Sequence, residues 1–267
     1  MQLQSNTVMK QQDSNIVELA DAHCHLDIFE NFNVIKQSIN RGVKIIIGNG
    51  IDTPSNMKAV ELSDNINIFA TMGVDPENAI IMGDDELEFN IKLIRENKNR
   101  IVGIGEVGLD NKIALNNDQK NRQLYVFNRM LDLALELDLP VSIHSRGAFD
   151  EVISALTNKK VKRVHMHFFE GDENQAKVLA DNNFFMSVPP VETSKRKRAI
   201  NAMPLSNIMT ETDSPVVGKS PMDVSISLGM IANTKKIDYN EAAIVIMNNT
   251  KAFFNISNKL KGYRQIR

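Results

Sequence analysis

Eight segments with the composition of β-strands recur along the chain, and a segment with the composition of a helix follows each one. Some of these strands, such as residues 42–49 and 101–108, are continuous apolar runs, which is typical of strands covered on both faces. Alternation of this kind implies parallel strands. Eight units favour a single (β/α)8 TIM barrel of the α/β class, with its active site at the carboxyl ends of the strands. The alternative is an open doubly wound sheet, although no glycine-rich phosphate fingerprint follows the first strand.

The sequence also predicts where the elements begin and end. The expected strands are residues 16–25, 42–49, 66–73, 100–110, 140–146, 161–169, 184–188 and 206–213. The expected helices are residues 33–40, 53–63, 85–98, 118–137, a helix ending near 156, 172–181, 193–203, and two at the C-terminal end, the last over 238–254. Thr53 is expected as an N-cap before Pro54, and Asp238 as the cap of the last helix. The apolar stripe of the longest helix is expected to comprise Leu124, Phe127, Leu131 and Ala134.

Length and composition place the chain among single-domain globular proteins. Residues 1–15 are polar and read as a flexible tail, which leaves residues 16–267 as one barrel domain. The single cysteine, Cys24, excludes an intramolecular disulfide, is expected to point toward the helix layer, and fits a reducing, cytoplasmic location. No apolar run approaches the ~18 residues that a membrane span needs, and no obligate protein partner is evident. A net charge of −2 argues against a protein that coats nucleic acid, but not against an enzyme that holds a phosphodiester through metal ions.

All five histidines fall on predicted strands that are well separated in sequence. His23 and His25 end the first strand and project the same way, because side chains alternate along a strand. His144 ends the fifth strand, and His165 and His167 lie on the sixth. An isolated His-x-His pair also fits two hydrogen-bonded core histidines, so its meaning depends on what the other strands supply.

Two further strands supply carboxylates. Glu106 lies near the end of the fourth strand, and Glu211 and Asp213 lie at the end of the eighth. Imidazole together with carboxylate suits Zn²⁺, Mn²⁺ and similar ions, whereas a lone cysteine disfavours an iron–sulfur or cysteine-bound zinc site. This many ligands exceeds the need of one zinc ion and fits two ions about 3.5–4 Å apart. The sequence therefore predicts a centre of two divalent metal ions (Mg, Mn or Zn).

With these residues identified, the chain resembles the TatD family of metal-dependent hydrolases, within the amidohydrolase-like barrels. The resemblance runs from about residue 20 to 254 and rests on five motifs in order: DAHCHLD (21–27), GEVGLD (105–110), PVSIHSR (140–146), HFFEG (167–171), which fits His-x-Phe-x-Gly, and ETDSP (211–215). It implies a deoxyribonuclease that hydrolyses phosphodiester bonds in DNA, often from the 3′ end, with Mg²⁺ or Mn²⁺ and a metal-activated water. A metal-dependent hydrolase of a cyclic amide, lactone or other ester in the same barrel is the alternative.

The resemblance also implies a role for each ligand. One metal would be held by His23, His25 and Asp213, the other by His144 and His167, with Glu106 bridging the two. Asp213 would orient the water and accept its proton.

Two residues of the ligand strands are expected to lie behind the metals. Glu211 precedes Asp213 by two and is expected deeper, as a hydrogen-bond partner of the ligands. His165 is expected to be a hydrogen-bonded interior residue, since the motif favours His167 as the ligand.

The substrate side departs from the family pattern. Asp75 stands where the family typically has a histidine, and Glu170 replaces a small residue; both add negative charge near the mouth. Arg146 is expected either to bind a substrate phosphate or to neutralise Asp75 or Glu170. The basic run 195–198 either tracks a nucleic-acid backbone or forms the solvated face of its helix.

Overall fold

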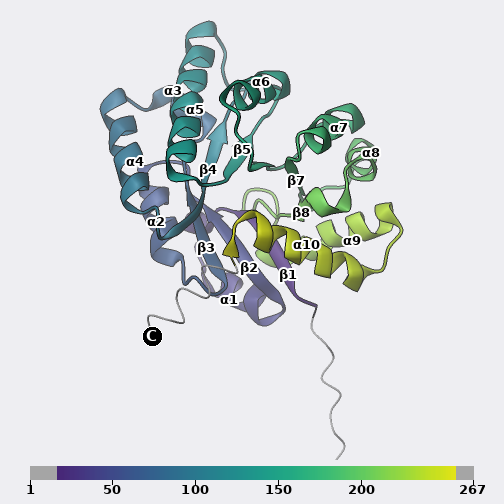
Figure 1. The fold of residues 1–267 in the computed structure, drawn as a ribbon. Helices are drawn as coiled ribbons and strands as arrows, with labels where there is room; N and C mark the ends of the chain where they lie inside the picture. The colour runs from purple at the N-terminus through teal and green to yellow at the C-terminus, as the bar shows by residue number, and fades with distance from the viewer. Residues whose placement is uncertain (1–16, 257–267) are drawn as a thin grey trace, which may run out of the picture.

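Eight parallel strands form the centre of the molecule, and helices surround them (Figure 1). The computed structural model describes residues 17–256, so the predicted tail, residues 1–15, lies outside the described residues. Neighbouring strands follow chain order from the first to the eighth, as a (β/α)8 barrel requires. The strands are β1 (Leu19–Cys24), β2 (Val43–Asn49), β3 (Ile68–Met72), β4 (Ile101–Gly108), β5 (Val141–His144), β6 (Val164–Met166), β7 (Phe185–Val188) and β8 (Ile208–Thr210).

The barrel closes between β8 and β1, at the carboxyl ends of both strands. The backbone N–H of Asp213 donates to the carbonyl of His23, and that of His25 donates to the carbonyl of Ser214, both at 2.9 Å. Cys24 and Ser214 form a parallel bridge between these two bonds. Because the first and last strands are joined, the fold is the predicted barrel and the open sheet is excluded.

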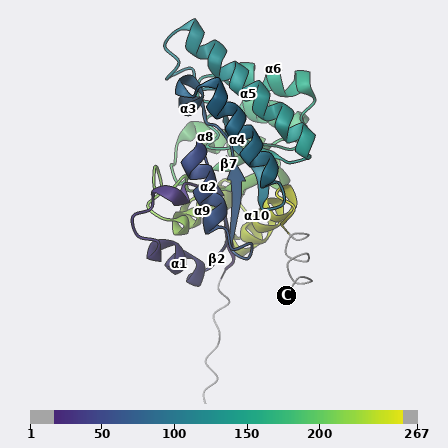
Figure 2. The ribbon, with the colours of Figure 1, turned by 90° about the vertical axis from the view of Figure 1, so that its left-hand side faces the viewer.

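Helices cover the outside of the strands, and α2, α4 and α5 lie along one flank (Figure 2). The helices are α1 (Asn33–Asn40), α2 (Thr53–Leu62), α3 (Pro76–Ile81), α4 (Asp84–Glu96), α5 (Asn117–Leu137), α6 (Phe149–Lys159), α7 (Glu173–Asp181), α8 (Ser194–Ala202), α9 (Val224–Lys235) and α10 (Tyr239–Phe253). Every predicted strand and helix is present. The short helix α3 is the one that the sequence pattern did not indicate, since its six residues are too few to show a period.

The ends of some elements differ from expectation. β6 and β8 have only three residues each, because strand pairing ends before the polar residues His167 and Asp213, which therefore lie in the loops that follow. Thr53 is not the N-cap of α2: Asp52 is, and its carboxylate accepts from the Ser55 N–H at 2.9 Å. Asp238 caps α10 as predicted, accepting from the N–H groups of the next turn.

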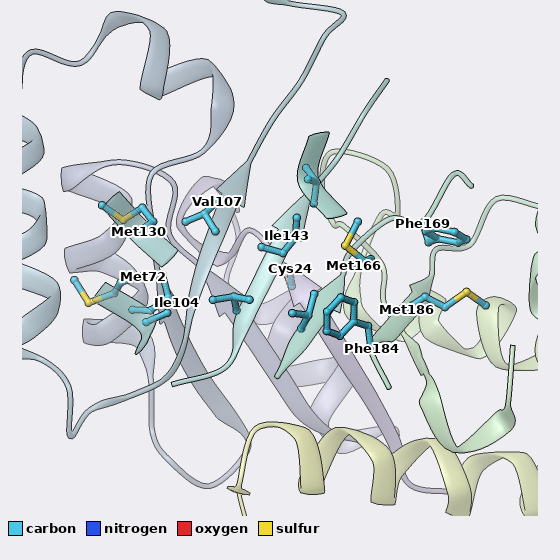
Figure 3. Packing of buried hydrophobic residues seen from close by; sticks show 14 of the residues in the cluster. Cys24, Met72, Ile104, Val107, Met130, Ile143, Met166, Phe169, Phe184 and Met186 are labelled. Atoms are coloured by element: carbon cyan, nitrogen blue, oxygen red, sulfur yellow. The ribbon is translucent and has the colours of Figure 1, made fainter. Parts of the chain in front are cut away.

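The main hydrophobic layer lies between strands and helices; Figure 3 shows part of it, including Ile104, Ile143 and Met130. Cys24 belongs to this layer, as predicted. In α5, Phe127, Leu131 and Ala134 are buried as predicted. The prediction that Leu124 belongs to the same buried stripe is wrong, because Leu124 is 40% exposed. Gln123 faces inward in its place, accepting from the Asp110 N–H and donating to the Pro76 carbonyl.

A second, smaller hydrophobic cluster lies inside the barrel. It is formed by alternate strand residues such as Ala22, Ile47 and Phe69, which point to one face. Phe253 and Phe254, at the end of α10, complete the cluster. This part of the interior is therefore packed, and the cavity described below lies at the carboxyl ends of the strands.

Candidate metal centre

Six side chains predicted as metal ligands come together at the carboxyl ends of five different strands. His23 lies on β1, one residue before its end, and His25 follows the strand; Glu106 lies on β4, His144 ends β5, His167 follows β6 and Asp213 follows β8. Five of the six are buried, and His144 is partly exposed. The sequence separation of these residues is large, so the barrel topology alone brings them together.

Glu106 lies at the centre of the group. Its Oε1 is 2.9 Å from His144 Nδ1 and 3.0 Å from His167 Nε2. Its Oε2 is 3.2 Å from His23 Nε2 and 3.6 Å from His25 Nε2. One carboxylate thus faces two histidines with each oxygen, which is the arrangement expected of a group shared by two ions.

Asp213 completes the half of the centre that contains the β1 histidines. Its Oδ1 is 3.2 Å from His25 Nε2 and 3.7 Å from His23 Nε2. The two histidine Nε2 atoms are themselves 3.3 Å apart. Asp213 has a φ of 50°, in the left-handed region, which aspartate tolerates better than most residues.

His144 has a second partner that the sequence reasoning missed. Its Nε2 is 2.9 Å from Oδ2 of Asp110, a buried carboxylate, while its Nδ1 faces Glu106. Asp110 Oδ2 is also 2.9 Å from Nε of Arg146. Asp110 closes the GEVGLD motif, four residues after Glu106, and that position was the available signal. A carboxylate that holds the far nitrogen of a histidine fixes the ring for metal binding.

Beneath the six residues lies a layer of buried polar groups. Glu211 is fully buried; it accepts from the Phe168 N–H and from the Ser187 hydroxyl, each at 2.6 Å. Its Oε2 is 3.8 Å from His167 Nδ1, too far for a direct hydrogen bond. His165 lies between the hydroxyls of Ser142 (3.1 Å) and Ser187 (2.6 Å), the hydrogen-bonded interior position that was expected.

The electrostatics of the group favour a cation. Burial by itself would raise the pKa of Glu106, but His167, His144 and His23 hold that pKa well below its usual range. Burial and the neighbouring His167 lower the pKa of His23, which keeps its imidazole neutral. Burial opposes protonation of His144 as well, yet Asp110 and Glu106 raise its pKa to about 9. Positive charge is therefore stabilised between these carboxylates.

The donor atoms fit divalent metal ions. His23, His25 and Asp213 place three ligand atoms within 4.8 Å of one another, and so do Glu106, His144 and His167. Each trio offers nitrogen and oxygen lone pairs to a metal when its histidines are neutral. The 3.3 Å approach of His23 Nε2 to His25 Nε2 needs a shared proton or a cation between them. Nitrogen and oxygen ligands without thiolate suit Mg²⁺, Mn²⁺ or Zn²⁺.

The predicted substrate residues line a cavity of about 790 Å³ above the carboxylates Glu106 and Asp213. Asp75 caps α3, and its Oδ1 accepts from both the backbone N–H and the amide of Asn78 at 2.8 Å. Burial and the nearby Glu106 raise the pKa of Asp75 to about 6. Arg146 pairs with Asp110, so the expectation that it neutralises Asp75 or Glu170 is wrong.

The basic run 195–198 divides between different environments. Lys195 lines the cavity, whereas Lys197 and Arg198 pair with acidic neighbours on the surface. Arg196 is buried against the ring of Phe168. The run is thus neither a continuous basic track nor a uniformly solvated face.

Comparison with known proteins gives a consistent result. A family model described as TatD related DNase matches residues 20–255. The human protein named deoxyribonuclease TATDN3 is 30% identical over 260 residues, covering 89% of this chain and 95% of that protein. The metal-dependent hydrolase YabD of Bacillus subtilis is 30% identical over 258 residues, covering 90% of this chain and 100% of that protein. The crystal structure of the TatD homolog YjjV from Escherichia coli superposes with a TM-score of 0.80 at 26% identity, covering 90% of this chain and 99% of that one.

Proposed function

We propose that this chain, which belongs to the TatD related DNase family of metal-dependent hydrolases, hydrolyses phosphodiester bonds in DNA at the centre built around Glu106. The observation that carries the proposal is the convergence of four histidines and two carboxylates at the mouth of the barrel. A relative named as a deoxyribonuclease supports the choice of DNA as substrate. The buried, free Cys24 is compatible with a cytoplasmic location.

The chain would hold two divalent ions. His23, His25 and Asp213 form one group, His144 and His167 form the other, and Glu106 belongs to both. When bound, such ions polarise the phosphoryl oxygen and lower the pKa of a water molecule toward 7. Asp110 holds His144 from behind, and Glu211 fixes the backbone after His167.

Side chains that line the cavity would orient the attacking water, accept its proton and bind the substrate phosphate. Asp213 reaches the cavity, and although burial would raise its pKa, His25 and His23 keep that pKa below its usual value. The carboxylate is therefore ionised at neutral pH and can orient the attacking water and accept its proton. Arg146 is half-exposed and anchored by Asp110, which leaves its outer N–H groups free to donate to a substrate phosphate.

A hydrolase of a lactone, cyclic amide or other ester is the second candidate. The observation in its favour is the charge of the cavity, where eight carboxylate side chains face one arginine and one lysine, Arg146 and Lys195, beside the two proposed ligands His144 and His167. Such a lining suits a neutral substrate better than a polyanion.

The test compares the two substrate classes directly. Protein loaded with Mn²⁺ or Mg²⁺ is incubated with 3′-labelled single-stranded DNA and, separately, with a panel of esters and lactones. We expect shortening of the DNA, and loss of that activity in Asp213→Asn with an unchanged circular dichroism spectrum. Turnover of the panel with intact DNA would refute the nuclease assignment.

A further inference from the structure

Phe168 occupies the variable position of the His-x-Phe-x-Gly motif, directly after the proposed ligand His167, and has no part in the chemistry above. Its φ is 45°, in the left-handed region that bulky side chains rarely adopt. The buried carboxylate of Glu211 holds this conformation by accepting the Phe168 N–H at 2.6 Å. Strained backbone maintained beside a reaction centre often serves to aim a side chain.

Arg196 of α8 fixes the ring of Phe168. It is only 7% exposed, and its guanidinium carbon lies 5.4 Å from the centre of that ring. One of its nitrogens donates to the Val191 carbonyl, and its Nε has no hydrogen-bond partner among residues 17–256. Burial lowers the pKa of Arg196, which shows that the cation is held there at a cost. A cation over an aromatic face is attracted to it and restricts its motion.

The ring of Phe168 also lines the cavity, together with Glu106 and Asp213. Phe168 is partly exposed, whereas the next residue, Phe169, is buried. Outside the proposed metal ligands, the cavity offers a phosphate backbone little positive charge, since Arg146 is paired with Asp110 and Lys195 is the other lysine or arginine of the lining. Metal ions at the centre would attract the scissile phosphate, but the rest of a nucleic acid would gain from a contact with the protein that does not depend on charge.

We propose that Phe168 is a stacking platform for an unpaired nucleobase next to the scissile phosphate, and that Arg196 is the positioning residue that holds the ring. Aromatic side chains stack on bases of any sequence, because every base has a π-face, and duplex bases keep those faces covered. The proposal rests on the nuclease function above and adds to it a residue that recognises the base next to the scissile phosphate.

The test uses two 3′-labelled single strands of equal length. One carries normal bases, and the other carries tetrahydrofuran abasic residues at its three 3′-terminal positions. For the wild-type protein we expect KM to be about tenfold lower on the normal strand, the size of one stacking contact. Phe168→Leu should raise KM on the normal strand to the abasic value with kcat nearly unchanged, and Phe168→Trp should keep the difference. Phe89→Leu, at a 53% exposed phenylalanine outside the cavity, is the matched control and should behave as wild type.

Arg196 has a separate prediction. Arg196→Met should raise KM on the normal strand without changing KM on the abasic strand, and Arg196→Lys, which keeps the cation, should restore the lower value. If Arg196→Met does not fold, Arg196→Gln takes its place, and an unchanged KM on the normal strand in the folded variant would overturn the positioning role of Arg196.

The outcomes separate the two proposals. Equal KM for both strands in the wild-type protein, with cleavage of both, would overturn the stacking role and leave the nuclease function standing. Cleavage of neither strand by the metal-loaded protein would overturn the nuclease function itself.

Discussion

The substitution Glu106→Gln tests the centre most directly, because this one carboxylate faces four histidines. Glutamine keeps the shape of the side chain and removes its charge. Its amide can still donate to one imidazole nitrogen and accept from another at the 2.9–3.2 Å contacts that Glu106 makes. We therefore expect the fold to survive and metal affinity to fall.

The magnitude follows from ligand linkage. An ion present at 100 times its dissociation constant stabilises the native state by about 2.7 kcal/mol. Loss of a hydrogen-bond partner behind a ligand weakens binding by about 10–100-fold, and loss of a bridging ligand is at least as severe. After a 100-fold loss, the same ion concentration contributes only ~0.4 kcal/mol. At roughly 2–4 °C per kcal/mol for a domain near this size, a metal-induced rise in Tm of about 5–11 °C shrinks to about 1–2 °C.

Differential scanning calorimetry across a Mn²⁺ or Zn²⁺ titration, with isothermal titration calorimetry for stoichiometry, measures both quantities. Glu77→Gln removes a carboxylate from an exposed position in the same cavity lining and is the matched control. The reasoning is refuted if Glu106→Gln shows the same Tm rise and the same metal stoichiometry as the wild-type protein.

Three further predictions concern the carboxylates around the centre. Asp110→Asn should lower metal affinity by about 10–100-fold, read by the same titration, because it releases His144 and Arg146; an unchanged affinity would remove Asp110 from the site. Burial and Glu106 raise the pKa of Asp75 to about 6 in the folded protein, above the unfolded value of 3.8, so its ionisation lowers stability as pH rises from 4 to 6. Asp75→Asn should therefore gain about 2 kcal/mol over wild type between pH 4 and 7 in urea unfolding without metal, and a pH-independent difference would contradict this. Asp75→His should raise kcat/KM on single-stranded DNA about tenfold by easing repulsion of phosphate, and a fall would show that capping of α3 matters more.

The fold followed from the sequence because strand-like apolar segments alternate eight times with helical segments, even though β6 and β8 keep only three residues each in the ladder. Eight alternating units can fold either as a closed barrel or as an open sheet. In both folds the strands are parallel, so polar residues at their carboxyl ends can be predicted to lie on the same side of the sheet. The residues that converge on Glu106 were therefore predictable as a group. The six-residue helix α3 was not, since a single turn and a half has no visible period.

What the sequence could not show is which polar groups pair across the site. Arg146 was expected beside Asp75 or Glu170, and it pairs with Asp110. That choice depends on the exit angle of β4 and β5, and side-chain spacing along a strand contains no information about it. The Phe168–Arg196 contact joins a loop after β6 to α8 and is equally invisible in the sequence.

The departure from the family at Asp75 now has a structural reason and a functional consequence. Asp75 caps α3 through Asn78, so the position carries a local structural role that an acidic side chain fulfils well. At pH 7 it is mostly ionised and adds to the negative charge around Glu106. A phosphodiester must enter against that charge, whereas a neutral ester or lactone need not. Asp75→His should therefore improve DNA cleavage but leave turnover of a neutral ester unchanged, and equal effects on both would mean that Asp75 acts on the metal centre and not on the substrate.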